Sequence, residues 1–196
     1  MMDDDIKIVI VGDSGIGIKS MIKAYCARNP SRILGKSLRI GSEDTYIQVL
    51  YKQYRLTLLC CEILDGKEHQ KNKPICYKGT DVVLICFSLA SLKSFIHVIN
   101  KWYPETNQYC PNGTKFVVAT MSDLRRNDQI KHYSNIDNDI ITRELGDNLT
   151  RYFNADGYFE CSSVSGEGLN DLFHQLIDFV LQKREQKRHG KLCTIL

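Results

Sequence analysis

The sequence has little of what a secreted, membrane-spanning or nucleic-acid-binding protein needs. No apolar run approaches the ~20 residues of a membrane-spanning helix, and the acidic start MMDDD lacks the basic segment of a signal peptide. A net charge of +3 over 196 residues is too small to indicate binding to nucleic acid. The eight cysteines include no C-x-x-C pair, which argues against a metal site. We therefore expect reduced thiols that pack as small apolar groups in the cytosol.

What the chain does contain is a regular alternation of strand and helix patterns. Buried strands are predicted at 6–11, at two stretches within 45–61, and at 81–87, 115–120 and 157–163. Helices are predicted at about 18–27 and 91–102, and at the end at 168–183. Such alternation favours one α/β domain with a mostly parallel six-stranded sheet and helices on both faces.

A glycine-rich turn, IVIVGDSGIGIKSM at 8–21, joins the first predicted strand to the first predicted helix. It approaches the phosphate-loop pattern G-x-x-x-x-G-K-[ST], in which backbone amides and a lysine bind phosphates. Here Ile18 follows the second glycine of the pattern, and the Lys-Ser pair comes one place late. The residues predicted to bind phosphate are Gly12, Asp13, Ser14, Gly15, Ile16, Gly17, Lys19 and Ser20.

Several separated runs make essentially the whole chain resemble a Ras-superfamily small GTPase, and in particular the Rho/Rac branch. They are TDVVLICFSLASLKSF at 80–95, KWYPE at 101–105, YCPN at 109–112, DLR at 123–125 and ECSS at 160–163. The span between the last two is long enough for the extra helical insert typical of the Rho branch. The resemblance implies a monomer with the Ras-like P-loop NTPase fold, a GTPase domain over 1–182, and GTP or GDP bound with Mg²⁺.

The resemblance leaves two positions open for the phosphate-loop lysine. Aligned without a gap, Ile18 takes its place, Lys19 takes that of the magnesium-binding Ser or Thr, and Tyr25 matches a tyrosine of the first helix. A one-residue bulge would return Lys19 and Ser20 to the family's positions but would put Tyr25 out of step. A shift of one residue turns a helical side chain by about 100°. We favour loss of the lysine, with the bulge as the alternative.

The family's magnesium aspartate, in a D-x-x-G motif, and its water-orienting glutamine are also altered. The aspartate corresponds to Cys60, Glu62 or Ile63, depending on the register chosen. In the last of these registers Lys67 takes the place of the glutamine. Asp65 is a possible substitute, although it fits better as a turn residue before glycine. We therefore assign no catalytic residue and expect hydrolysis to be impaired.

The first switch region departs from the family in the same way. Ser37 lies near the threonine that ligates magnesium in the family, so the predicted metal ligands are Ser37 and Ser20. The departures as a group argue against a well-held magnesium ion. By resemblance, the effector region consists of Ser37, Leu38, Arg39, Ile40 and Gly41.

The guanine-recognition side is better preserved. The motif N/T-K/Q-x-D is present as TMSD at 120–123, where Asp123 would accept hydrogen bonds from guanine N1 and N2. The alternative role of Asp123 is that of a helix cap or turn residue. CSSV at 161–164 matches the family's serine-alanine motif. The predicted guanine-binding residues are Thr120, Asp123, Ser162 and Ser163.

The last segment, 183–196, is a basic tail that ends in Cys193-Thr-Ile-Leu, a C-a-a-X box. The final leucine favours a geranylgeranyl group on Cys193. A lipid chain and a polybasic patch together anchor a protein to anionic lipid. The tail therefore predicts the cytoplasmic face of a membrane, the plasma membrane by resemblance, with a cytosolic pool.

Two hypotheses of function follow. The first is a Rho/Rac-like GTP-binding switch in membrane-associated signalling, with actin regulation implied by resemblance and effectors, exchange factors and GDI-like chaperones as partners. The second is a pseudo-GTPase, either nucleotide-free or nucleotide-locked, that acts as a membrane-anchored binding module. A third, an enzyme of other chemistry, lacks any supporting Ser-His-Asp or Cys-His grouping.

Overall fold

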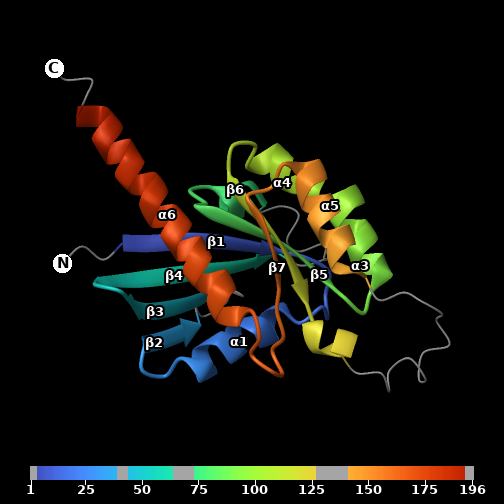
Figure 1. Cartoon of the computed structure of the whole chain (residues 1–196). Helices are drawn as coiled ribbons and strands as arrows, with labels where there is room; N and C mark the ends of the chain where they lie inside the picture. The colour runs from blue at the N-terminus through green and yellow to red at the C-terminus, as the bar shows by residue number, and fades with distance from the viewer. Residues whose placement is uncertain (1–3, 39–43, 64–72, 127–140, 193–196) are drawn as a thin grey trace.

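The computed structural model describes residues 4–38, 44–63, 73–126 and 141–192. This part of the chain forms a seven-stranded sheet in the order β2-β3-β4-β1-β5-β6-β7 (Figure 1). The strands are β1 (Asp4–Val11), β2 (Ile33–Leu38), β3 (Thr45–Tyr51), β4 (Tyr54–Ile63), β5 (Val82–Ser88), β6 (Thr114–Thr120) and β7 (Gly157–Glu160). β1 is parallel to β4 and β5, and β6 is parallel to β5 and β7, whereas β3 is antiparallel to β2 and β4. The predicted α/β fold is confirmed.

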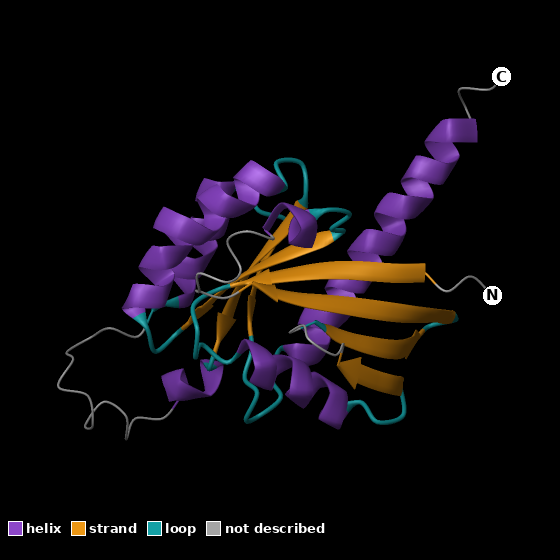
Figure 2. Cartoon of the chain, turned by 180° about the vertical axis from the view of Figure 1, so that it is seen from behind, coloured by secondary structure: helices purple, strands orange, loops and turns teal. Residues whose placement is uncertain are grey.

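Helices cover both faces of the sheet (Figures 1 and 2). One face carries α1 (Ile18–Arg28) and the long α6 (Leu169–Leu192). The other face carries α2 (Lys73–Tyr77), α3 (Leu92–His97), the π-helical turn η1 (Val98–Trp102), α4 (Tyr103–Tyr109) and α5 (Arg143–Phe153). A 3₁₀ turn, η2 (Ser122–Arg126), follows β6. Among the described helices, none has the length and apolar character that crossing a membrane requires.

The sheet has one strand more than predicted, because β2 was missed. Its sequence, ILGKSL, contains a glycine and lacks the β-branched, alternating pattern by which the other strands were recognised. β2 lies at the edge of the sheet, and its pairing with β3 is irregular between Ile33 and Gly35. An edge strand pairs along one side only, and its hydrogen bonds to β3 do not require a particular side-chain pattern.

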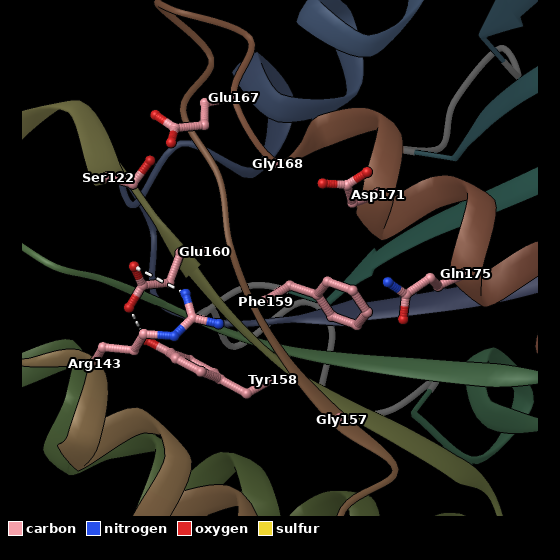
Figure 3. Close-up of a pocket in the computed structure, with 10 residues that line it drawn as sticks. All are labelled: Ser122, Arg143, Gly157, Tyr158, Phe159, Glu160, Glu167, Gly168, Asp171 and Gln175. Atoms are coloured by element: carbon pink, nitrogen blue, oxygen red, sulfur yellow. Dashed lines mark hydrogen bonds and ion pairs between the residues drawn. The ribbon is translucent and has the colours of Figure 1, made fainter.

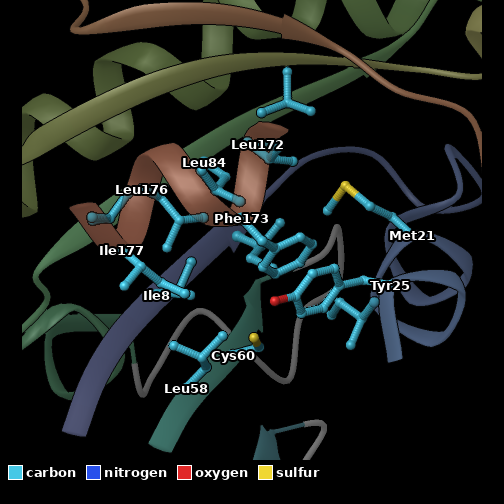
Figure 4. Close-up of a cluster of buried hydrophobic side chains, with 14 of the residues drawn as sticks. Ile8, Met21, Tyr25, Leu58, Cys60, Leu84, Leu172, Phe173, Leu176 and Ile177 are labelled. Atoms are coloured by element: carbon cyan, nitrogen blue, oxygen red, sulfur yellow. The ribbon is translucent and has the colours of Figure 1, made fainter. Parts of the chain in front are cut away.

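Two apolar clusters, one on each face of the sheet, form the core. Ile8 and Ile10 of β1 enter the cluster under α1 and α6, and the alternate residues Val9 and Val11 enter the other. In the first cluster the Tyr25 ring stacks on Phe173 with centroids 4.0 Å apart (Figure 4). This stacking joins the first helix to the last.

The last helix continues past the end predicted for it near Lys183. Lys183 Nζ donates a hydrogen bond to Thr114 Oγ1 at 3.1 Å, and Arg184 forms an ion pair with Asp81 at 3.1 Å. The helix then extends beyond the sheet to Leu192 (Figure 1). Lysine, arginine, glutamate and glutamine are good helix formers, which explains the continuation through this basic segment. The division at residue 183 stays a prediction.

Candidate functional site

The glycine-rich turn, residues 12–17, links the carboxyl end of β1 to the start of α1. Gly15 and Gly17 have φ angles of 83° and 95°, a left-handed conformation that glycine adopts at no steric cost. A Cβ on Gly12 would lie 2.6 Å from Ile16 Cδ1 and 2.9 Å from the carbonyl oxygen of Cys86 on β5. The glycines therefore allow a tight loop that packs directly on the neighbouring strand.

The start of α1 directs backbone amides toward this loop. Gly17 is the N-cap and provides no side-chain hydrogen bond to the helix. The first intrahelical bond runs from Met21 N to Gly17 O at 2.9 Å. The amides of the first turn and the positive end of the helix dipole form the kind of site that binds phosphate or another anion.

The three residues after Gly17 have contrasting environments. Ile18 is the first residue of α1. It is buried in the core beneath the helix, with only 3% of its surface exposed. Lys19 and Ser20, predicted to bind phosphate, follow in the first turn and are both exposed. Tyr25 is fully buried two turns later. The loop enters the helix directly at Ile18, and the tyrosine lies in the first helix, buried in the core.

The end of β4 gives different surroundings to the three residues proposed for the magnesium aspartate. Cys60 points into the apolar cluster beside Tyr25 (Figure 4). Ile63 lies in the cluster on the opposite face of the sheet. Glu62, which is 6% exposed, pairs with Ile10 of β1 and therefore lies close to the phosphate loop. Asp65, Gly66 and Lys67 lie outside the described residues.

The described residues of the loop do not fit a magnesium ion held as the family holds it. Lys19 is the second residue of α1, and in the gap-free register it places a cation where the family has a hydroxyl ligand. Magnesium prefers oxygen ligands in a regular octahedral arrangement. Ser20 is one residue further around the helix, and Ser37 lies in β2, which β3 and β4 separate from β1. Glu62 is the only one of the three aspartate candidates that is a carboxylate.

Thr120 lies behind the predicted base site. It is 2% exposed, and its hydroxyl contacts the carbonyl oxygens of Ile16 at 2.5 Å and Phe87 at 3.1 Å. The next residue, Met121, has a φ of 61°, and its methyl group lies 3.6 Å from the position of a Cβ on Gly17. Thr120 thus fastens the phosphate loop to β6, and Met121 packs on the start of α1.

The other three predicted guanine-binding residues come together. Ser162 Oγ donates a hydrogen bond to Asp123 Oδ1 at 2.5 Å. Ser162 Oγ also accepts hydrogen bonds from the backbone N–H groups of Val164 at 3.1 Å and Ser165 at 3.0 Å. Ser163 is half-buried in the same turn. The two base-recognition segments, although far apart in the sequence, therefore share one hydrogen-bond network.

An ion pair that the sequence analysis did not identify holds these two segments together. Arg125 of η2 contacts Glu160 of β7 through two nitrogens, at 2.5 and 3.0 Å, and Tyr158 Oη donates to Glu160 at 2.8 Å. Burial and the adjacent Glu160 raise the pKa of Tyr158. Both charged residues belong to the runs DLR and ECSS, which were used only for the resemblance. Their opposite charges were the available signal.

A cavity of about 350 Å³ lies beside β7, and Figure 3 shows Glu160 in its lining together with Arg143, which lies 3.8 Å from it. Its lining includes Arg143, Glu160, Glu167 and Asp171, but no residue of the phosphate loop and not Asp123. The cavity is therefore separate from the predicted nucleotide site.

Asp13, predicted among the phosphate-binding residues, turns its side chain away from the loop. Its Oδ2 lies 2.7 Å from His97 Nδ1, and its Oδ1 accepts a hydrogen bond from Trp102 Nε1 at 2.8 Å. Sequence analysis missed both partners, because 84 and 89 residues separate them from Asp13.

The remaining predicted residues fall mostly outside the described part of the chain. Ser37 and Leu38 pair with Tyr46 and Thr45 in the β2–β3 ladder. Arg39, Ile40, Gly41 and Cys193 lie outside the described residues, as does 127–140, which is part of the span between Asp123 and Glu160 where the insert is expected.

One comparison with known proteins bears on this arrangement. The Ras family model matches residues 7–182, which is most of the chain. The matched span includes the phosphate loop, both base-recognition segments and the sheet except the first residues of β1.

Proposed function

This chain belongs to the Ras family of small GTP-binding proteins, and from that premise we propose that it is a Rho/Rac-branch member that retains guanine nucleotide and hydrolyses it poorly. The observation that carries the proposal is the burial of Ile18 at the first position of α1. The two halves of the nucleotide site therefore differ. The base side keeps its polar groups, whereas the phosphate side has lost the positive charge of the family's lysine.

Binding without the lysine would rest on the backbone. The glycine loop and the first turn of α1 present amides to an anion, and Thr120 and Gly12 keep the loop against β6 and β5. Lys19 adds a positive charge in the same turn. We infer that these groups hold a diphosphate or triphosphate less tightly than a complete phosphate loop does, and with little dependence on magnesium.

Slow hydrolysis follows from the same residues. Phosphoryl transfer depends on positive charge near the developing negative charge and on an oriented water molecule. Ile18 provides no charge, and no register of β4 and the segment after it restores both the magnesium aspartate and the glutamine that orients water. Each lost donor of this kind costs roughly a hundredfold or more in rate.

Guanine recognition is assigned to the network around Asp123. Ser162 holds the Asp123 carboxylate at 2.5 Å, and the Arg125–Glu160 ion pair connects the two segments. A carboxylate in this place can accept the N–H groups of guanine, which adenine does not offer. Ser163 completes the segment that supports the base.

We propose from the sequence of the tail that this activity takes place at a membrane surface. Cys193 in its C-a-a-X box is proposed to carry a geranylgeranyl group, and the basic residues from Lys183 onward add attraction to anionic lipid. The protein would then act in signalling at the cytoplasmic face of the plasma membrane, with a cytosolic pool. Effectors, exchange factors, GDI-like chaperones and a role in actin organisation are proposed from the Rho/Rac resemblance.

A pseudo-GTPase is the second candidate, and the same Ile18 favours it. If the backbone amides alone do not hold phosphate, the fold remains as a rigid, anchored module for binding other proteins. Its two apolar clusters are formed by side chains of the chain itself, one on each face of the sheet.

One experiment separates the two candidates. The full-length protein is purified, denatured, and its released nucleotide identified by chromatography, with and without EDTA and after loading with GTP or GDP. We expect about one GDP or GTP per chain and little effect of EDTA. A folded protein that is empty and cannot be loaded would leave only the pseudo-GTPase.

A further inference from the structure

We propose that Asp13, His97 and Trp102 form a clamp that positions the phosphate loop, and that these three are positioning residues for nucleotide binding. The proposal rests on the nucleotide-binding function proposed above. It assigns a specific task to an acidic residue that lies, unexpectedly, inside an anion-binding loop.

The clamp satisfies both oxygens of one carboxylate. Asp13 Oδ2 lies 2.7 Å from His97 Nδ1, and Asp13 Oδ1 accepts from Trp102 Nε1 at 2.8 Å. The side chain of Asp13 is 14% exposed and that of His97 is 32% exposed, while Trp102 is fully buried. When both oxygens of a carboxylate are hydrogen-bonded and little water reaches them, the side chain is held in one orientation.

The π-helical turn explains how both donors reach one carboxylate. His97 ends α3 and Trp102 ends η1, five positions further along the chain. In an α-helix, two side chains five residues apart point about 140° from each other. The wider π-helical turn reduces this angle, so that both side chains can face Asp13. Turns of this kind are frequently found at functional sites.

The clamp matters because of the charge of Asp13. An aspartate within a loop of backbone amides would compete with a phosphate for those amides and repel it. The clamp turns the carboxylate toward α3 and away from the loop. Two other contacts, Thr120 on Ile16 and Gly12 on β5, fasten the loop elsewhere. Loss of the clamp would therefore release the carboxylate without unfolding the loop.

The test uses the full-length protein and two readouts. Release of a fluorescent GDP analogue measures nucleotide retention, and the emission of Trp102, the only tryptophan in the chain, reports the clamp itself. His97→Leu removes the donor, and His97→Asn restores a neutral N–H donor. His174→Leu is the matched control, since His174 contacts Arg32 on another part of the surface.

We expect His97→Leu to speed nucleotide release about tenfold, since one hydrogen bond to a charged group is worth that much or more, and to change Trp102 emission. His97→Asn should return both values close to wild type, and His174→Leu should change neither. The charge argument further requires that His97→Leu have no effect on release in the Asp13→Asn background. If His97→Leu alone fails to fold, nucleotide release is measured for His97→Leu in the Asp13→Asn background instead.

Unchanged emission and unchanged release in His97→Leu would overturn the clamp. So would an equal acceleration in the Asp13 and Asp13→Asn backgrounds, because the effect would then not pass through the carboxylate. If the wild-type protein binds no nucleotide, the proposed function fails, and the clamp is judged by a thermal-unfolding cycle of the Asp13 and His97 variants. Additive effects in that cycle would overturn it, and coupling together with the emission change would support it.

Discussion

Ile18 and Lys19 illustrate how a single register decides the chemistry available to the phosphate loop. Both are in the first turn of α1, yet Ile18 is buried among apolar side chains and Lys19 is exposed. Neighbouring helical positions point in different directions, so one residue cannot replace the other. A one-residue bulge that moved Lys19 into the lysine position would put Tyr25 out of step. The Tyr25 ring is fully buried on Phe173, so its place in the core argues against the bulge.

Substitution of the two residues distinguishes loss of the lysine from its displacement. We expect Ile18→Lys to tighten GDP binding at least tenfold, even though a buried lysine lowers the unfolding free energy of the empty protein. Lys19→Met should weaken binding by less than about threefold, because an exposed charge is screened by water and salt. Equilibrium titration with a fluorescent GDP analogue measures both. A larger loss in Lys19→Met than in any other loop variant would favour the bulge.

Alkaline pH should destabilise the fold through its buried thiol and phenol groups. Burial raises the pKa of Cys161 from 9.0 to about 12 and, as the largest of several causes, that of Tyr25 from 10.0 to about 12. The folded state thus favours the neutral forms, while the unfolded chain ionises first. The stability that the Cys161 thiol contributes is complete below pH 9.0 and is lost as the pH rises toward about 12.

Urea unfolding at about pH 8 and about pH 10.5 checks this sign. We expect a lower unfolding free energy at the higher pH, and a smaller drop in Cys161→Ala, which lacks the thiol. Equal stabilities of the wild-type protein at the two values would show that these groups ionise without cost in the fold.

At the scale of elements, polar groups join η2 to β7 and to the turn after it. Arg125 pairs with Glu160, and Asp123 accepts a hydrogen bond from Ser162. Glu160 is shielded, with 10% of its side chain exposed, while Arg125 is 31% exposed. A shielded pair loses more on removal of one partner than a surface pair does, because the other charge stays behind.

Glu160→Gln should therefore lower the unfolding free energy by about 2 kcal/mol. It should also speed release of a guanine nucleotide, since Asp123 loses the support of the Arg125 segment. Asp178→Asn is the control, because the Lys52–Asp178 pair is exposed, with side-chain exposures of 58% and 36%, and shares no residue with the Arg125–Glu160 pair. Urea titration and nucleotide-release kinetics are the measurements. Equal effects of the two substitutions would mean that the Arg125–Glu160 pair has no special role.

At the scale of the whole molecule, α6 connects the nucleotide-binding domain to the tail. Its first half packs against Tyr25 and the sheet, and its second half extends past Arg184, whose ion pair with Asp81 is a contact with the sheet end (Figure 1). The proposed lipid anchor at Cys193 comes just after this helix. The helix therefore separates the anchor from the predicted site.

Cys193→Ser should move the protein from the membrane to the soluble fraction when it is expressed in eukaryotic cells. One lipid chain with a basic patch gives stable but reversible anchoring, and the patch alone gives weak, salt-sensitive binding. Membrane fractionation at low and high salt measures the shift. Cys110→Ser, far from the tail in sequence, is the control and should stay with the membrane. Persistence of Cys193→Ser in a salt-resistant membrane fraction would contradict the lipid anchor.

The sequence by itself determined the α/β fold, the approximate bounds of six strands and the glycine loop, and it singled out Asp123 and Ser162, which the fold joins by a hydrogen bond. Each of these depends on local patterns: alternating burial, glycine turns and short motifs. β2 and the continuation of α6 escaped because neither has a strong pattern of its own.

Only the tertiary structure decided which side chains meet. The pairing of β4 with β1 puts Glu62 near the loop while Cys60 enters the core, although both were candidates from the sequence. The hydroxyl of Thr120 turned out to hold Ile16, and the carboxylate of Asp13 turned toward His97 and Trp102. Local patterns specify elements, but distances between residues far apart in the chain follow from sheet order, strand register and helix rotation, which exist only once the whole core is packed.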